Sequence, residues 1–152
     1  MPPALPIEGG CRCGQVRFRI DAQPMMTMAC HRRGCQQMSG SAFSLNVAVP
    51  STTLTITQGD TVIGGLRGEQ IRHHHCGDCK SWLFTRIEPD PGFANVRVGA
   101  LDDPAPFASF IETWTDEALA WATTPARHRY PQSPPPEAFG PLLAEFAARQ
   151  SG

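Results

Sequence analysis

Cys11-Arg12-Cys13 and Cys76-Gly77-Asp78-Cys79 are the stretches that decide the fold, because they place two close pairs of cysteines far apart in a chain of 152 residues. Such pairs have the spacing of a zinc knuckle, and a tetrahedral zinc site needs four soft ligands. Folding that brings the two pairs together would supply those ligands. We therefore predict one structural zinc ion, held by Cys11, Cys13, Cys76 and Cys79.

Disulfide bonds are the alternative, since the chain has six cysteines, an even number. Three features favour a metal. The chain is longer than the small secreted scaffolds that depend on disulfides, the residues of each pair are very close in sequence, and the N-terminus lacks a basic start followed by an apolar run. We accordingly expect a cytoplasmic protein.

Length and charge limit the domain count and the partners. The length predicts one domain, with a mobile proline-rich leader over residues 1–8 and a zinc-binding β domain over residues 9–152 that includes a proline-rich tail. No apolar stretch approaches the roughly 18 residues of a membrane span. The net charge of −1 gives no electrostatic reason to expect nucleic acid or an anionic membrane as a partner. We expect a monomer or a homodimer.

Alternation of apolar and polar residues predicts a mainly antiparallel β domain. The pattern is clearest where apolar residues occupy every second position, which half-buries one face of a strand. It occurs over residues 16–20, 43–49, 54–56, 96–98 and 110–114, with glycine and proline breakers between these segments.

The C-terminal region has a different pattern. Six prolines from Pro125 to Pro141 argue against regular strands there. Beyond them, apolar side chains recur at helical spacing, and a proline is tolerated in a first helical turn. We predict one short C-terminal helix packed on the sheet, with its apolar face formed by Leu142, Leu143, Phe146 and Ala147.

Several motifs of the chain occur together in one known family. They are Gly9-Gly10-Cys11-Arg12-Cys13-Gly14, Cys30-His31 through Cys35 followed by Ser39-Gly40-Ser41-Ala42-Phe43, Cys76-Gly77-Asp78-Cys79, and Gly99-Ala100-Leu101-Asp102-Asp103-Pro104. In order and spacing they resemble the motifs of the glutathione-dependent formaldehyde-activating enzyme family, over about residues 8–122. The resemblance implies an all-β zinc fold shared with methionine sulfoxide reductase B. It also implies a carbon–sulfur lyase reaction that joins formaldehyde to the glutathione thiol as S-(hydroxymethyl)glutathione.

The family has a second, catalytic zinc held by three thiolates of a Cys-x-Cys-x2-Cys segment, and the chain departs from it there. Cys30 and Cys35 match the outer cysteines, whereas Arg32 stands at the middle position. An arginine stays protonated and cannot ligate a metal. His31 is a candidate third donor, but we expect a solvated or hydrogen-bonded histidine near the site. A second zinc ion is therefore not expected to bind tightly.

Three smaller features complete the comparison. His73 and His75 would share one face of a strand as a metal clamp, although we favour an edge or solvent-facing strand that delivers Cys76 to the zinc. Lys80 stands where the family has glycine, which would cost about 1 kcal/mol if the backbone there is left-handed. Glu112 stands where family members often have a histidine.

Three functions fit these observations. The first is a lyase-type enzyme of weakened or altered activity that acts on a small-molecule thiol or thiol adduct, with Cys30 and Cys35 as reactive thiolates and Arg32 and Arg33 attracting a glutathione carboxylate. The alternative for the two arginines is a solvated pair of loop charges. The second function is a non-catalytic zinc module that binds a small ligand. The third is a dithiol redox protein that uses Cys30 and Cys35.

Overall fold

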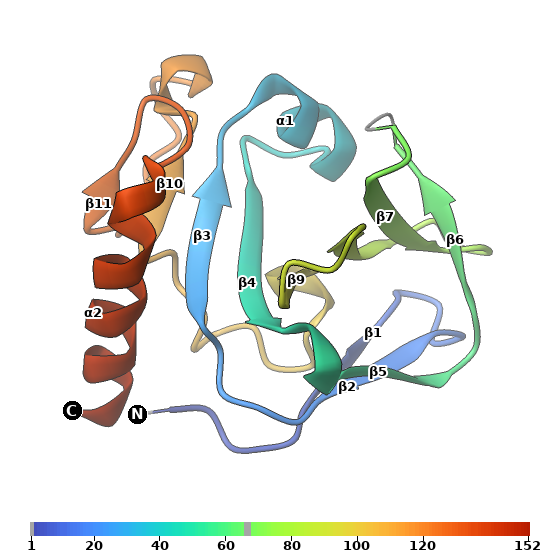
Figure 1. Cartoon of the computed structure of the whole chain (residues 1–152). Helices are drawn as coiled ribbons and strands as arrows, with labels where there is room; N and C mark the ends of the chain where they lie inside the picture. Colours follow the sequence, from blue (N-terminus) through green and yellow to red (C-terminus); the bar gives the residue numbers. More distant parts are fainter. Residues whose placement is uncertain (1, 66–67) are drawn as a thin grey trace.

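The computed structural model describes residues 2–65 and 68–152 of the chain. Within them, eleven strands form two sheets, and two α-helices join them (Figure 1). The three-stranded sheet has the order β1-β2-β5, and the eight-stranded sheet has the order β11-β10-β3-β4-β9-β8-β7-β6. The elements are β1 (Ile7–Gly10), β2 (Arg17–Ile20), β3 (Met26–Cys30), α1 (Arg33–Ser39), β4 (Ser44–Pro50), β5 (Leu54–Gln58), β6 (Thr61–Gly64), β7 (Ile71–Cys76), β8 (Trp82–Ile87), β9 (Phe93–Arg97), β10 (Ile111–Thr113), β11 (His128–Arg129) and α2 (Phe139–Ser151).

The main core lies between the two sheets, where the predicted alternation buries one face of each strand. Phe18 on β2 meets Phe84 on β8 edge to face, with ring centroids 6.2 Å apart. Val47 and Val96 are register partners on β4 and β9, and both are fully buried in the same cluster. The predicted class, a mainly β fold with a short C-terminal helix, is confirmed.

Part of the opposite face of the large sheet is polar, and its position decides where the site lies. Cys30 is the register partner of Ser44, and Asn46 is the register partner of Arg97. Because side chains alternate along a strand, these four residues lie on one face, opposite to Val47 and Val96. Polar and thiol groups of β3, β4 and β9 are thus brought together.

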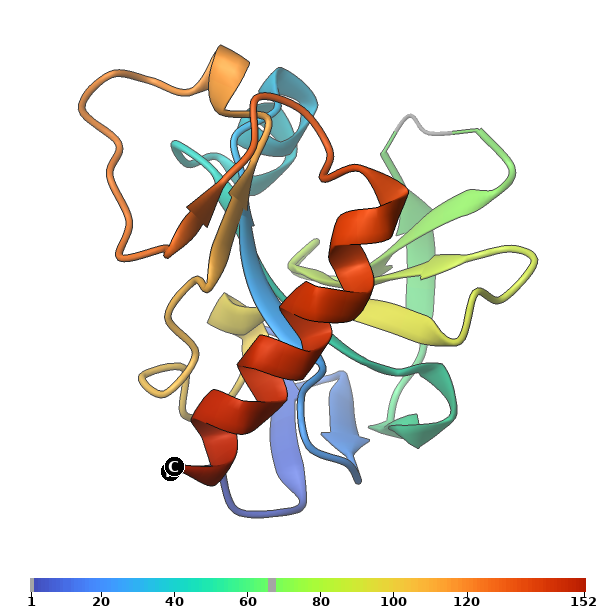
Figure 2. The same ribbon diagram turned by 60° about the vertical axis from the view of Figure 1, so that its left-hand side comes forward.

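Helix α2 covers one end of the large sheet, as predicted for the C-terminal helix. Figures 1 and 2 show it running alongside β3 and β10, with the two chain ends close to each other in Figure 1. Leu142 and Phe146 are buried against Met26, Phe110 and Ile111. The apolar stripe of the helix therefore closes a second, smaller core.

Some elements differ from the sequence-based expectation. Strand β11 forms between Pro125 and Pro131, where the prolines argued against strands; it is only two residues long and pairs with β10 in parallel. Strand β10 also runs parallel to β3, so the sheet is antiparallel only for the most part. Strand β1 begins at Ile7, two residues before the expected domain boundary. No helix in the described part of the chain is both long and apolar enough to span a bilayer.

Candidate metal centre and adjoining pocket

The four predicted cysteines come together at the end of two strands. Cys11 directly follows β1, and Cys76 is the last residue of β7. The Sγ atoms of Cys11, Cys13, Cys76 and Cys79 all lie within 4.8 Å of one another. Among the described residues, this is the only group of three or more histidine, cysteine or acidic side chains close enough to share a metal ion.

The geometry of this centre fits a tetrahedral metal ion. Four sulfurs at about 2.3 Å from a zinc ion would be about 3.8 Å from one another. The Sγ of Cys13 lies 3.5 Å from that of Cys11 and 3.7 Å from that of Cys76. These two distances are close to those of a tetrahedral site, and no two of the four sulfurs are more than 4.8 Å apart, so the four-cysteine centre could hold a metal ion.

Backbone and hydroxyl donors contact three of the four sulfurs, those of Cys11, Cys76 and Cys79. The Val16 N–H donates to Cys11 Sγ at 3.2 Å, and the Asp78 N–H donates to Cys76 Sγ at 3.4 Å. The Ser81 hydroxyl lies 3.1 Å from Cys79 Sγ, and its hydrogen bond is the main cause that lowers the pKa of Cys79 to about 5. Ligating cysteines must be thiolates, so these bonds prepare the centre for a metal.

Two turns give the centre its shape. Gly14, after the first pair, has a φ of 81°, and its N–H donates to the Cys11 carbonyl at 3.1 Å. Lys80, after the second pair, has a φ of 62°, and its N–H donates to the Cys76 carbonyl at 3.1 Å. The left-handed backbone considered for Lys80 is thus present, with a strain of about 1 kcal/mol.

Cys30 and Cys35 form a separate thiol pair. Cys30 ends β3, Cys35 lies in α1, and their side chains hydrogen-bond each other. That bond, followed by burial, raises the pKa of Cys30. The family's middle cysteine is replaced by Arg32, whose guanidinium stacks on Trp114 with 4.5 Å between the guanidinium carbon and the ring centroid. Arg33 donates from Nη1 to Gln36 Oε1 at 2.6 Å.

His31 is hydrogen-bonded rather than part of the four-cysteine centre. Its Nε2 lies 3.0 Å from Glu112 Oε1, and both side chains are completely buried. Glu112 also accepts a bond from the Thr124 hydroxyl at 2.8 Å and has Arg129 Nε 2.6 Å from its Oε2. Sequence reasoning noticed Glu112 but missed its partners, because β11 brings Arg129 alongside from a distant segment; a lone acidic residue in the apolar run 110–114 was the available signal.

The expectation of an edge or solvent-facing strand for the three histidines is wrong. Strand β7 is internal, with β6 outside it, and His73 is 6% exposed. His73 Nδ1 lies 2.8 Å from the Thr85 hydroxyl, and its ring meets Trp82 edge to face at 5.2 Å. His74 stacks on Phe84 at 4.6 Å. The rings of His73 and His74 therefore pack against aromatic side chains of β8.

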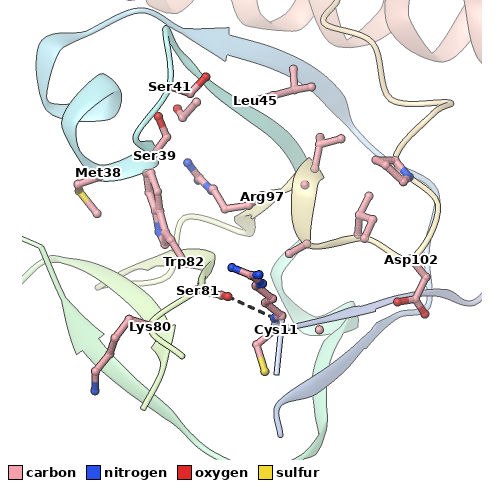
Figure 3. Close-up of a pocket in the computed structure, with 18 of the residues that line it drawn as sticks. Cys11, Met38, Ser39, Ser41, Leu45, Lys80, Ser81, Trp82, Arg97 and Asp102 are labelled. Atoms are coloured by element: carbon pink, nitrogen blue, oxygen red, sulfur yellow. Dashed lines mark hydrogen bonds between the residues drawn. The ribbon is translucent and has the colours of Figure 1, made fainter. Parts of the chain in front are cut away.

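A pocket of about 1130 Å³ opens between the four-cysteine centre and the helix α1 region (Figure 3). Cys11 and Lys80 lie at one side of it, and Ser39 and Ser41 lie at the other. Arg97 points into the space between them, beside the ring of Trp82. Ser44, the register partner of Cys30, also lines the pocket. The residues predicted to react or to bind substrate are not among the lining residues; they are Cys30, Cys35, Arg32 and Arg33.

Arg97 is a site residue that sequence reasoning missed. Burial lowers its pKa to about 9, and the nearby sulfurs of Cys35 and Cys30 offset part of that effect. It remains protonated at neutral pH. Its position between Val96 and Val98 indicated the polar face of a strand, but only the folded sheet shows that this face is buried beside the two thiols.

The fold and the centre define a mainly β protein with a four-cysteine metal-type site and a cationic pocket beside a thiol pair. The chain belongs to the glutathione-dependent formaldehyde-activating enzyme family, whose model matches residues 6–117. The match includes all six cysteines and ends near the start of the proline-rich region.

One protein similar in sequence supports this placement, and one solved structure supports the fold. A protein of Penicillium rubens named "Putative glutathione-dependent formaldehyde-activating enzyme" is 29% identical over 87 residues, which are 57% of this chain and 46% of that protein. The chain thus spans about half the length of this relative. A crystal structure of a Rhodobacter sphaeroides protein has a TM-score of 0.56 and 16% identity, covering 70% of this chain and 99% of that one, and it supports the fold alone.

Proposed function

We propose that this protein is a zinc-binding carbon–sulfur lyase of weakened activity, which forms or cleaves S-(hydroxymethyl)glutathione-type adducts. In this proposal the four-cysteine centre holds one structural zinc ion, and the reaction takes place at Cys30 and Cys35. Family membership supports the reaction class, and the adjoining pocket supports a small ligand.

The proposal that the activity is weakened rests on one observation. The middle position of the second cysteine motif is Arg32, and its guanidinium stacks on Trp114. The motif therefore provides two thiols, which already bond each other. Two thiolates are a poor site for zinc, which takes at least three protein ligands in catalytic centres.

The two thiols can still assist the reaction through proton transfer. Cleavage breaks the carbon–sulfur bond, leaves the sulfur with the electron pair, and converts the hydroxymethyl group to an aldehyde when the hydroxyl loses its proton. A hydrogen-bonded pair of cysteines with one ionised member can accept that proton on one sulfur and supply a proton to the departing sulfur from the other. Arg32 and Arg33, at the start of α1, are the proposed binding groups for a glutathione carboxylate.

Exchange spectroscopy of the formaldehyde–glutathione equilibrium tests this proposal. We expect the unaltered protein to exceed the spontaneous rate only slightly, and the Arg32→Cys variant to exceed it strongly. A single electrostatic stabiliser is worth about a hundredfold to a thousandfold in rate. If neither protein accelerates exchange, the non-catalytic ligand-binding module becomes the better account.

A dithiol redox role is the second candidate, because Cys30 and Cys35 bond each other directly. Oxidation would form their disulfide and pass two electrons and two protons to a disulfide co-substrate such as oxidised glutathione, whose S–S bond breaks to give two thiols. A redox titration of the Cys30→Ser variant against the unaltered protein would show this couple. Identical titrations would remove this candidate.

A further inference from the structure

Arg97 is a buried cation with no carboxylate partner among the described residues. Its side chain is 9% exposed, and its guanidinium carbon lies 3.8 Å from the centroid of the Trp82 ring. Its Nε has no hydrogen-bond partner, and the bond from Nη2 to the Asn95 carbonyl is 3.5 Å long. Buried charges in proteins are normally paired and hydrogen-bonded, so this one leaves room for an anion.

The surroundings of Arg97 carry further unused polar atoms. Asn46, its register partner on β4, is 4% exposed and has a buried Oδ1 without a hydrogen-bond partner. Asn95 Oδ1 is in the same condition. Both Oδ1 atoms are hydrogen-bond acceptors, so they need a donor from water or from another group of a ligand, and the carboxylate itself cannot satisfy them.

The charge of the pocket has the same sign as Arg97. Four cationic side chains line it, and Asp102 is the only carboxylate among its lining residues; the four are Arg12, Arg17, Lys80 and Arg97. Arg17 pairs with Asp102, with 2.5 Å between Nη2 and Oδ2, so that carboxylate is already in use. The chain as a whole has a net charge of −1, which makes this pocket a local exception.

We propose that Arg97 binds the carboxylate of a small thiol-bearing ligand, with the Trp82 ring stacked on the guanidinium and the ligand thiol directed toward Cys30 and Cys35. A guanidinium has five donors in a planar fork that matches a carboxylate, and Ser39 and Ser41 lie on the side of the pocket toward which it points (Figure 3). The identity of the ligand as a thiol acid rests on the proposed function.

The path from Arg97 to the thiols runs across one strand. Cys30 faces Ser44 on β4, Asn46 on the same strand faces Arg97, and all four side chains lie on the polar face of the sheet. Burial lowers the pKa of Arg97, and the sulfurs of Cys35 and Cys30 lie close enough to offset part of that effect. The proposed ligand therefore lies across β4, between the guanidinium and the thiol pair.

Calorimetric binding of two matched probes tests this inference. The probes are 3-mercaptopropionate and 3-mercapto-1-propanol, which share the thiol and differ in the carboxylate. The unaltered protein should bind the acid at least about tenfold more tightly than the alcohol, since one charge-assisted bidentate contact is worth about 1.5 to 3 kcal/mol. Arg97→Gln should remove this preference, whereas Arg19→Gln, which changes an exposed arginine outside the pocket, should keep it.

The other possible results of this binding experiment also support or overturn the anion site at Arg97. Equal affinity for both probes in the unaltered protein would overturn the inference, and this result does not depend on the folding of any variant. A parallel loss of both probes in Arg97→Gln would show a structural role and would also overturn it. Arg97→Lys should keep part of the preference, because the charge stays and the fork is lost.

The test is independent of turnover, because no aldehyde is present. A clear preference for the acid without catalysis would defeat the proposed function and leave the anion site standing. Catalysis without that preference would defeat the anion site alone.

Discussion

The four-cysteine centre and the Cys30–Cys35 pair show two ways in which one fold positions cysteines. In the first, four sulfurs lie within 4.8 Å of one another, and backbone N–H groups of Val16 and Asp78 donate to them. In the second, two thiols bond each other beside the cation Arg97. The first is arranged for a metal ion, whereas the second has a fixed positive charge nearby, which can serve a thiolate or an anionic ligand.

The largest expected effect is on folding through the four-cysteine centre. Cys76→Ser removes a buried sulfur that lies 3.7 Å from Cys13 Sγ. A structural zinc ion contributes on the order of 10 kcal/mol to folding, so this variant should be insoluble or unfolded. Cys30→Ser is the matched control and should remain folded. A soluble Cys76→Ser protein with unchanged melting behaviour would contradict the assignment.

The next effect concerns the thiol pair. Arg32→Cys should raise the zinc content of the protein by one ion per chain, because it restores the third thiolate of the motif. The new ion should accelerate adduct exchange by about a hundredfold or more. Arg33→Cys, one residue away, is the control and should change neither quantity. Elemental analysis of both purified variants checks this, and equal zinc contents would disprove the role of the missing cysteine.

A smaller effect is expected at the buried carboxylate near the thiol pair. Arg129→Gln leaves Glu112 completely buried with one charged partner fewer, and it should lower the free energy of unfolding by about 2 kcal/mol. Arg127→Gln, which breaks the exposed pair with Glu145, should lower it by about 0.5 kcal/mol at most. Urea denaturation of the two variants measures the difference. Equal values would show that the Glu112 pair contributes no more than a surface ion pair.

The smallest effect concerns the turn at Lys80. With a φ of 62°, Lys80→Gly should raise the free energy of unfolding by about 0.5 to 1 kcal/mol through relief of left-handed strain. Lys80→Ala is the control, since it keeps a Cβ at this φ and, like glycine, loses the rest of the side chain with the Nζ that donates to the Gly77 carbonyl. A glycine variant no more stable than the alanine variant would show that strain at this turn is negligible.

The sequence predicted the parts of the molecule that depend on local pattern. The close cysteine pairs predicted the metal-type centre. The alternation of apolar and polar residues predicted strands such as β2 and β4. Strand β3 was missed, because its residues Met26–Cys30 show no clear alternation in a strand with neighbours on both sides. Helix α1 was missed because it is seven residues long and has only one fully buried side chain, Gln36.

The site contained features that no local pattern could show. The ion pair of Glu112 with Arg129 depends on the parallel pairing of β10 with β11. Arg97 becomes a buried cation only because β9 lies inside the sheet and Trp82 of the neighbouring strand packs on its guanidinium. The prediction for the three histidines was wrong for a related reason. Their polar rings indicated a solvent-facing strand, but the rings of His73 and His74 pack against aromatic side chains on β8.

The most direct test of the difference between the two cysteine regions is the zinc content of the unaltered protein, measured together with a count of reactive thiols under native conditions. We predict one zinc ion per chain and two reactive thiols, assigned to Cys30 and Cys35 by their loss in Cys30→Ser and Cys35→Ser. Two tightly bound zinc ions per chain, with no reactive thiol, would contradict the account, because the second region would then hold a metal despite Arg32.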